Sequence, residues 1–372
     1  MNILFVGPYK QCDEWGRKSR ALLGALKKTG NTVTSRPIYF SPMRWEYHEE
    51  TEFSTCKSYD TVIQFTIPTF AVYDGKFKKN IGVFNTETID DSPFSTALSR
   101  MEILDEVWVE NEKVYEHLQN KVSNTQISLI DPYMDTSLEN DASHGRFDEG
   151  ILRKGAFEDK FMFYAIGSLG EREGCKELVC AYLSEFSSSD NSVLVYVLEN
   201  SADPAAVNEF INGCFKSIGA TKNADQRPML HIMNPDSPLP IEARLTVHKE
   251  GACFISPDYS LNCSTLILEA VAAESTPIVT KGTAAYDLLG ESGSWGVESY
   301  EESCILNHRA FDDMFTCDET CVRPTVRSLS RHMREAYTNK FLREKKRAHN
   351  KKTRELFESD AYYDTLKGLL CS

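Results

Sequence analysis

Long apolar runs and an excess of positive charge are both missing from this chain of 372 residues. No run of 18 or more apolar residues occurs, and the first residues, MNILFVG, lead directly into a strand-like segment. The sequence therefore predicts neither a membrane span nor a signal peptide, and we expect a cytoplasmic protein. Lys and Arg number 41 against 55 Asp and Glu, and this net charge of -14 disfavours bulk nucleic acid as a partner. The length suits two domains of ordinary size.

Disulfide and metal-ligand patterns are missing as well. The cysteines number eleven and lie mostly inside apolar segments, which is typical of reduced thiols in a cytosol. Cys317 and Cys321 are spaced CxxxC, but no second pair of Cys or His lies nearby to complete a zinc site. We expect no metal site.

The most informative stretch present is the segment from Ser256 to Thr280. An apolar run over 252–255 predicts a buried strand, which turn-forming residues end, and an apolar helix then continues as far as Pro277. Four residues offer side chains at the start of this helix: Asn262, Cys263, Ser264 and Thr265. Free amides and the positive end of the helix dipole can hold a diphosphate, so these four residues are candidate donor-binding groups.

Glu269 lies about one turn further into the predicted helix. A carboxylate at this position could accept hydrogen bonds from ribose hydroxyls, and we predict that role for it. The alternative is an ordinary strand-loop-helix unit of a parallel sheet, with Glu269 exposed or capped.

The same segment resembles the signature of family 4 glycosyltransferases, which are retaining enzymes with the GT-B fold. The resemblance is carried by Leu266, Ile267, Leu268, Glu269, Ala270, Ala272, Ala273, Pro277, Ile278 and Val279. It implies an α/β protein in which two Rossmann-like, doubly wound domains face a cleft, with donor nucleotide in the second domain and acceptor in the first. The family places a further Glu, beside the donor sugar, at the position that is Leu261 here.

The first half of the chain fits the first of these domains. Strands are predicted over 2–6, 32–37, 61–66, 80–85, 106–109 and 126–130, and a helix over 17–28. Gly16 lies at the first loop-helix junction, where a glycine lets a ligand approach the backbone closely. In the resembling family this loop contacts donor phosphates or the acceptor. The alternative for Gly16 is a simple helix start.

Two carboxylates follow the predicted strand 80–85. Glu87 and Asp90 would lie at the carboxyl edge of the sheet, where open parallel sheets bind ligands. We predict that they act on the acceptor, by orienting or deprotonating its hydroxyl. The alternative for Glu87 is a helix cap or an ion pair with a lysine. The surrounding run, VIQFTIPTFAVYDGKFKKNIGVFNTET, also resembles a subset of bacterial and phage glycosyltransferases.

The second half repeats the strand-loop-helix pattern, beginning with a strand over 161–166 and the loop GSLGEREG. Members of the resembling family place an Arg and a Lys in this loop to neutralise the leaving diphosphate. Those positions are Ser168 and Glu173 here, which leaves Arg172 as the nearby positive charge. We predict that Ser168 and Arg172 bind the donor and that Arg172 also assists catalysis. The alternative for Arg172 is an ion pair with a neighbouring glutamate.

These patterns predict four parts: domains over 1–135 and 159–337, a linker over 136–158, and C-terminal helices over 338–372 that cross back to the first domain. The last part is locally basic through Arg343, Lys345, Lys346, Arg347, Lys351, Lys352 and Arg354. A solvated helix face is one interpretation. Peripheral contact with an anionic membrane, or with nucleic acid, is the other.

The sequence thus predicts a retaining glycosyltransferase that moves a sugar from a nucleotide-diphosphate sugar to a hydroxyl of a glycan, lipid or other acceptor. The expected donor is a UDP-sugar, with a GDP-sugar second. The resemblance implies no required metal or other cofactor, and Asp90-Asp91 lacks the pattern that would support a DxD metal motif. Two alternatives stay open. Leu261, Ser168 and Glu173 suggest a catalytically weakened protein that binds nucleotide sugar or glycan, and the phage-like segment suggests an enzyme that acts on modified DNA bases.

Overall fold

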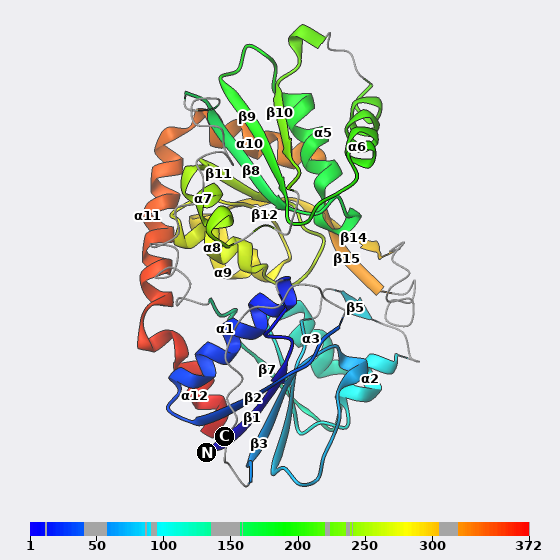
Figure 1. Cartoon of the computed structure of the whole chain (residues 1–372), viewed down its shortest axis with the longest axis vertical. Coiled ribbons are helices and arrows are strands. Elements are labelled where there is room, and N and C mark those ends of the chain that lie inside the picture. Colours follow the sequence, from blue (N-terminus) through cyan, green and yellow to red (C-terminus); the bar gives the residue numbers. More distant parts are fainter. Residues whose placement is uncertain are drawn as a thin grey trace.

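Two parallel sheets of six strands each organise the chain in the computed structural model (Figure 1). The structure describes residues 1–11, 13–40, 58–85, 88–90, 95–134, 157, 159–219, 224–235, 239, 241–304 and 319–371. We call each sheet with its helices a lobe; in Figure 1 the N-terminal lobe is the lower one and the C-terminal lobe the upper one. The predicted α/β class with two doubly wound units is confirmed.

The sheet of the N-terminal lobe has the strand order β2-β1-β3-β4-β6-β7. Its strands are β1 (Asn2–Gly7), β2 (Thr32–Pro37), β3 (Thr61–Phe65), β4 (Lys79–Val83), β6 (Glu106–Val109) and β7 (Gln126–Leu129). Its helices are α1 (Glu14–Lys28), η1 (Pro68–Phe70), α2 (Thr96–Met101) and α3 (Glu112–Lys121). Every residue of β3 is buried, as expected for a parallel strand covered on both faces. The six predicted strands are all present, with ends that agree to within two residues.

The first helix begins earlier than predicted, at Glu14 instead of Arg17. Asp13 caps it, because its side chain accepts a hydrogen bond from the amide of Gly16 at 3.0 Å. The first turn of α1 therefore includes one charged residue, Glu14, that the sequence pattern assigned to the loop.

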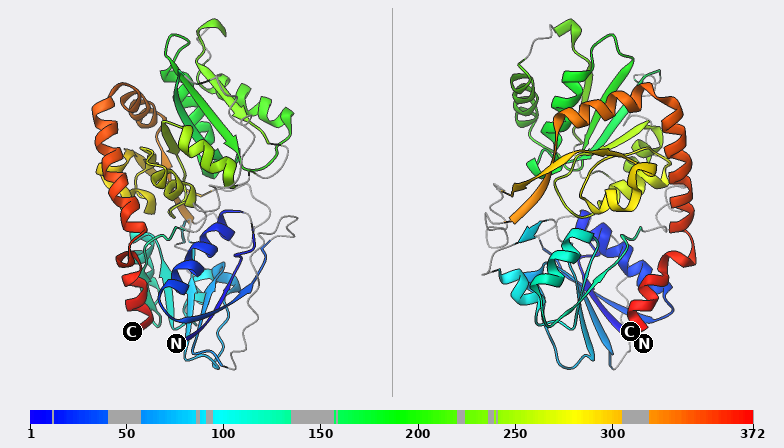
Figure 2. Two further views of the ribbon diagram at one scale, coloured as in Figure 1. Left: turned by 60° about the vertical axis from the view of Figure 1, so that its left-hand side comes forward. Right: turned by 180° about the vertical axis from the view of Figure 1, so that it is seen from behind.

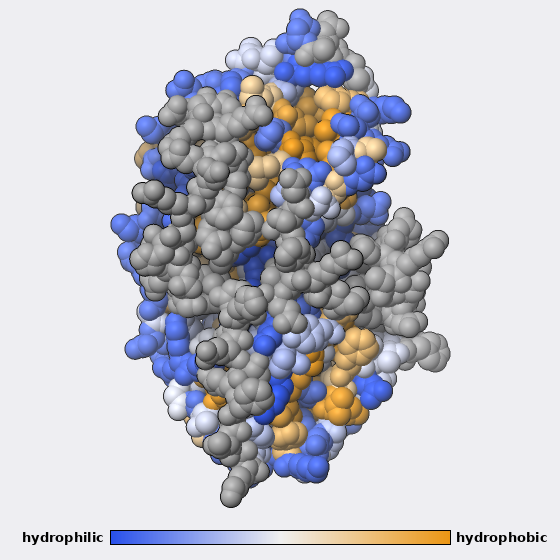
Figure 3. Space-filling view, viewed as in Figure 1, coloured by the Kyte–Doolittle hydropathy of each residue, from blue (hydrophilic) through white to orange (hydrophobic). Residues whose placement is uncertain are grey.

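The sheet of the C-terminal lobe has the order β10-β9-β8-β11-β12-β13. Its strands are β8 (Phe161–Gly167), β9 (Ser192–Leu198), β10 (Met229–Met233), β11 (Cys253–Ser256), β12 (Ile278–Thr280) and β13 (Trp295–Val297). Its helices are η2 (Glu171–Glu173), α5 (Cys175–Glu185), α6 (Pro204–Ser217), η3 (Ala224–Gln226), α7 (Ile241–Glu250), α8 (Thr265–Ala272) and α9 (Ala284–Gly293). Strand order reverses between β8 and β11, and such a switch point is where open α/β sheets bind ligands. β10 is a partly exposed edge strand, and apolar side chains gather over this part of the upper lobe in Figure 3.

A small antiparallel sheet joins the two halves of the chain, and the sequence pattern did not predict it. It contains β5 (Ile89–Asp90), β14 (Ser299–Ser303) and β15 (Glu319–Pro324), in the order β14-β15-β5. Asp90 pairs through its backbone with Glu319, so a strand from the N-terminal half extends a hairpin from the C-terminal half. β14 is polar and largely exposed, which removes the apolar signal that identified the other strands.

The C-terminal helices run along both lobes and bring the end of the chain close to its start (Figure 2). They are α10 (Val326–Thr338), α11 (Lys340–Phe357), η5 (Asp360–Tyr363) and α12 (Asp364–Cys371). Tyr362 donates a hydrogen bond to the carbonyl of Pro132, and its ring lies 5.4 Å from that of Tyr133. Lys28 of α1 donates to the hydroxyl of Tyr363 at 2.8 Å. The last helices are therefore fastened to the N-terminal lobe. Within the described residues, no helix has both the length and the apolar character to cross a membrane.

The basic stretch of α11 is only partly a solvated face. Lys346 donates to the carbonyl of Ser294 at 2.6 Å, Arg347 to Glu274 at 3.2 Å and Arg354 to Ala272 at 3.0 Å. These carbonyls lie at the ends of α8 and α9, where unpaired carbonyls and the negative end of the helix dipole attract cations. The exposed Lys and Arg residues on this helix are Lys340, Lys345, Lys351 and Lys352.

Candidate active site

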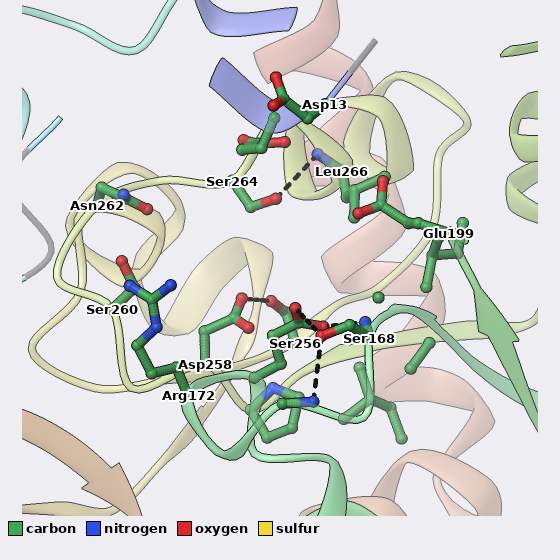
Figure 4. Close-up of a pocket in the computed structure, with 18 of the residues that line it drawn as sticks. Asp13, Ser168, Arg172, Glu199, Ser256, Asp258, Ser260, Asn262, Ser264 and Leu266 are labelled. Carbon is green, nitrogen blue, oxygen red and sulfur yellow. Dashed lines mark hydrogen bonds between the residues drawn. The ribbon is translucent and has the colours of Figure 1, made fainter. Parts of the chain in front are cut away.

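A cavity of about 540 Å³ lies between the lobes, at the carboxyl ends of β8, β9 and β11. The first turn of α1 closes it from the N-terminal lobe, and the start of α8 forms part of the opposite wall (Figure 4). It therefore lies at the switch point between β8 and β11, the place where this kind of sheet binds ligands.

The lining of the cavity is acidic. Its carboxylates are Asp13, Glu14, Glu171, Glu173, Glu199 and Asp258, and its guanidinium groups, among the described residues, are Arg17 and Arg172. An anionic ligand entering this space would meet repulsion unless carboxylates are paired, protonated or displaced. In the part of the chain that the structure describes, no three His, Cys, Asp or Glu side chains are grouped so as to hold a metal ion.

The loop after β8 is folded around one of these carboxylates. Glu173 accepts a hydrogen bond from the backbone amide of Ser168 and another from its hydroxyl, the latter at 2.6 Å. A Cβ atom added to Gly167 would lie 2.2 Å from the Glu173 carboxylate, so glycine is needed for this approach. Burial raises the pKa of Glu173, and the nearby charge of Glu199 raises it further, against the hydrogen bonds from Ser168.

The start of α8 is occupied by a carboxylate from the other lobe. Ser264 is the N-cap residue, and its hydroxyl accepts a hydrogen bond from the amide of Leu266 at 3.3 Å. The amide and hydroxyl of Thr265 both donate to Glu14, each at 2.7 Å. Burial alone would raise the pKa of Glu14, but the nearby charges of Arg17 and Lys18 hold it below the usual value. The carboxylate of Glu14 is therefore ionised and binds the N-terminus of α8.

Arg17 completes this contact between the lobes. Its Nη2 lies 2.7 Å from Glu14 and 2.8 Å from Glu199, and its Nε donates to the hydroxyl of Thr265 at 3.0 Å. Only 5% of Arg17 is exposed. Burial would lower the pKa of Arg17, but Glu199 and Glu14 raise it, so the guanidinium stays charged.

Glu269 lies behind the start of α8 and does not line the cavity. Its carboxylate makes a two-bond ion pair with Arg244 of α7, at 2.6 and 2.9 Å, and His248 lies 3.5 Å away. Burial alone would raise the pKa of Glu269, but Arg244 and His248 bring it far below the usual range. Its predicted contact with ribose therefore needs a ligand that reaches past the helix start, and that role stays a prediction.

The other predicted donor-binding residues lie in different places. Asn262, Ser264 and Ser168 line the cavity, whereas Cys263 is fully buried outside the lining. Gly16 is also outside the lining. A Cβ atom there would lie 1.9 Å from the carbonyl oxygen of Gln11, so the fold itself requires this glycine.

The predicted catalytic residues are divided in the same way. Arg172 lines the cavity, and its side chain points toward Ser260 in Figure 4. Glu87 lies outside the described residues, and for Asp90 the structure describes only the backbone position in β5. Most of the predicted linker 136–158 and Cys317 also lie outside the described residues.

Sequence reasoning missed Glu14, Arg17 and Glu199. A signal was present, because Glu14 and Arg17 follow closely on the first strand and Glu199 follows a later one, which places them at carboxyl edges of parallel sheets. Leu261, where the resembling family has a Glu, is buried and packs in an apolar cluster. Asp258 provides a carboxylate on the same loop that does line the cavity.

Comparison with known proteins shows the fold. No protein-family model and no curated protein sequence matches the chain. Among solved structures it is similar to an Escherichia coli protein described as trehalose-6-phosphate bound with UDP-2-fluoro glucose, with a TM-score of 0.65, 10% identity, and 100% of this chain and 98% of that chain covered. It is also similar to an α,α-trehalose-phosphate synthase (UDP-forming) from Burkholderia vietnamiensis, with a TM-score of 0.64, 10% identity and 99% of each chain covered. Anabaena Alr3699/HepE in complex with UDP gives a TM-score of 0.64 at 10% identity over 100% of both chains. The chain has the GT-B fold.

Proposed function

We propose that the chain is a glycosyltransferase that binds a nucleotide-diphosphate sugar in the cavity between its lobes. The observation that carries the proposal is the meeting of three features at one switch point: the loop after β8, the start of α8, and an opposing helix start from the other lobe. Strand ends and helix N-termini of this kind bind phosphate groups. The GT-B fold, and the UDP or UDP-sugar named with two of the similar structures, support a UDP-sugar before a GDP-sugar.

In this proposal the diphosphate lies against Ser168 and the α8 start, where Asn262 and Ser264 offer hydrogen-bond donors, and where Thr265 can donate once Glu14 has left it. The bond between the anomeric carbon and the diphosphate breaks, a bond to the acceptor oxygen forms, and the acceptor's proton passes to a base or solvent. Arg172 neutralises charge on the departing diphosphate. Attack from the face that the diphosphate leaves retains the anomeric configuration, without a protein nucleophile or a required metal.

The acceptor would enter from the N-terminal lobe, and closing the lobes would exclude water from the reacting groups. Glu87 and Asp90 are assigned to the acceptor hydroxyl on their position after β4, and Glu269 to the donor ribose. For the acceptor we propose only a chemical class: a glycan, a lipid or another molecule with a free hydroxyl. The division into domains 1–135 and 159–337, with crossing helices over 338–372, belongs to the same proposal.

The test is a thermal-shift series with UDP, GDP, ADP and CMP and their sugars, joined to an assay for slow donor hydrolysis. A ligand at ~100 times its dissociation constant stabilises the folded state by roughly 2.7 kcal/mol, which shifts the melting temperature measurably. We expect a selective shift with uridine nucleotides and slow release of UDP from a UDP-sugar. If no nucleotide shifts the transition, the donor site is wrong.

A second candidate is a catalytically weakened protein that binds nucleotide sugar or glycan. The contact between Glu173 and the Ser168 amide favours it, because an acid stands where the resembling family has a base. This candidate predicts a thermal shift with no hydrolysis and no transfer to any acceptor. It is wrong if the wild type transfers sugar readily and the combined change Leu261→Glu, Ser168→Arg and Glu173→Lys adds nothing.

A further inference from the structure

Two backbone amides, one of the lining residue Ser168 and one of Thr265 between the lining residues Ser264 and Leu266, already bind carboxylates of the chain itself. The amide of Ser168 at the end of β8 donates to Glu173, and the amide of Thr265 at the start of α8 donates to Glu14 at 2.7 Å. Amides at a strand end and at a helix N-terminus are the groups that hold phosphate oxygens in α/β sheets. Each of the two amides therefore holds an anion that the protein supplies.

The Glu14 contact crosses between the lobes and is largely buried, although the Glu14 side chain itself is 27% exposed. Glu14 and Arg17 belong to α1, whereas Thr265 begins α8 and Glu199 directly follows β9. Thr265 and Arg17 are 6% and 5% exposed. Exchange of the Glu14 carboxylate for another anion would keep the Thr265 amide and the Arg17 guanidinium paired, so the exchange leaves no buried polar group without a partner.

Arg17 has the chemistry that a diphosphate requires. Its guanidinium already binds two carboxylates, and it can donate hydrogen bonds to phosphate oxygens in the same geometry. The loop after β8 has one cation, Arg172, against the two carboxylates of Glu171 and Glu173, and so supplies no net positive charge. Within the described lining, Arg17 and Arg172 are the cations, and Arg17 is the one aligned with a helix N-terminus.

We propose that Glu14 and Glu173 are intramolecular stand-ins for a diphosphate, and that Arg17 binds the diphosphate after it has displaced Glu14. The identity of the nucleotide rests on the proposed function, but the inference itself requires only a pyrophosphate-type anion. Binding of that anion breaks the contact from Glu14 to Thr265 while Arg17 keeps Glu199. Ligand entry is thereby linked to the contact between the lobes.

The test is calorimetric titration of the full chain with inorganic pyrophosphate and, separately, with UDP. The variants are Glu14→Gln and Glu173→Gln, which keep the side-chain shape and remove one negative charge each. We expect either change to tighten pyrophosphate binding about tenfold, the order of one charge-assisted hydrogen bond. Adding Arg17→Gln to Glu14→Gln should abolish that gain.

Glu171→Gln is the matched control, because Glu171 lies on the same loop, lines the cavity, and is exposed. It removes the same charge from a side chain that binds neither of the two amides, so we expect less than a threefold change, in line with solvent screening. An equal gain in all three variants would mean that general charge, and not occupancy of the amides, controls binding. That result would overturn the inference.

The two ligands separate this inference from the proposed function. If UDP binds the wild type well and neither Glu14→Gln nor Glu173→Gln changes any affinity, the proposed function stands and the inference is wrong. If pyrophosphate follows the expected pattern and UDP binds no better than pyrophosphate, the inference stands and the nucleotide donor is wrong. Should Glu14→Gln not fold cooperatively, Glu14→Asp replaces it. Its carboxylate is one methylene shorter, so tighter binding is still expected and unchanged binding counts against the inference.

Discussion

At the scale of single residues, the position proposed for Glu173 predicts that anion binding depends on pH. Burial and the charge of Glu199 raise its pKa. Arg172 and the Ser168 hydroxyl also lie near its carboxylate, and both act to lower the pKa. A protonated Glu173 repels an anion less than an ionised one, so affinity for pyrophosphate should fall as pH rises through the raised pKa. Titrations from the ordinary glutamate pKa of 4.5 upward should show this fall in the wild type and a flatter profile in Glu173→Gln. Equal profiles would contradict the assignment.

Glu269 is a second residue whose ion-pair partner allows a prediction, in this case of the free energy of unfolding. The bidentate pair with Arg244 is buried, so Glu269→Ala should lower the free energy of unfolding by about 3 to 5 kcal/mol, because it leaves a buried cation unpaired. Since its folded pKa is depressed, the ionised pair stabilises the protein above the unfolded-state pKa, and this stability is lost as pH falls toward the folded pKa. Urea unfolding at several pH values measures both effects.

The same variant tests the ribose assignment when it is compared with Glu87→Ala. We expect Glu269→Ala to weaken nucleotide binding more than Glu87→Ala does, with binding measured at a temperature where both variants are folded. Changing Glu269 and Arg244 together to Gln and Met is the control, since removal of both charges should restore part of the stability. Equal losses of affinity in the two single variants would refute the role of Glu269.

At the scale of elements, the loop between β8 and α5 depends on a left-handed residue. Gly174 has φ = 61°, and a Cβ atom there would lie 2.1 Å from the carbonyl oxygen of Pro257. Gly174→Ala should cost at least about 1 to 2 kcal/mol of stability, and displacement of the loop should alter pyrophosphate affinity as well. Gly213→Ala in α6 is the control, because its Cβ would meet open space and alanine favours a helix by roughly 0.5 to 1 kcal/mol. Thermal unfolding distinguishes the two.

The elements also show how far sequence reasoning extends. The parallel strands were predictable because runs such as β3 and β9 are buried throughout and therefore mostly apolar. The sheet formed by β5, β14 and β15 was not, because its pairing joins distant segments and β14 is polar. Likewise, the local pattern before α8 placed Asn262 and Ser264 near the donor site, and the family resemblance did so for Ser168; all three line the cavity. The Glu14 and Arg17 contacts to Thr265 join residues about 250 positions apart, and no local pattern contains them.

At the scale of the whole molecule, α11 and the residues after it hold the two lobes together. α11 binds carbonyls at the ends of α8 and α9, and the segment beyond it packs on the N-terminal lobe. This internal use of Lys346, Arg347 and Arg354 also reduces the basic surface left for a nucleic acid or membrane partner. Gel retardation with duplex DNA at low salt should accordingly show no shift.

Tyr362 is the point at which this connection can be tested. It is 4% exposed, its hydroxyl donates to Pro132, and its ring packs on Tyr133 and on Phe357 of α11. Tyr362→Ala should cost about 3 to 5 kcal/mol, and because the loss falls between the lobes, it should separate one calorimetric transition into two. Phe341→Ala, on the same set of helices but 80% exposed, should change stability by less than about 0.5 kcal/mol. If Tyr362→Ala instead unfolds in a single transition at a lower melting temperature, the lobes are coupled mainly through the Glu14 and Arg17 contacts. Glu14→Gln combined with Tyr362→Ala should then produce the separation.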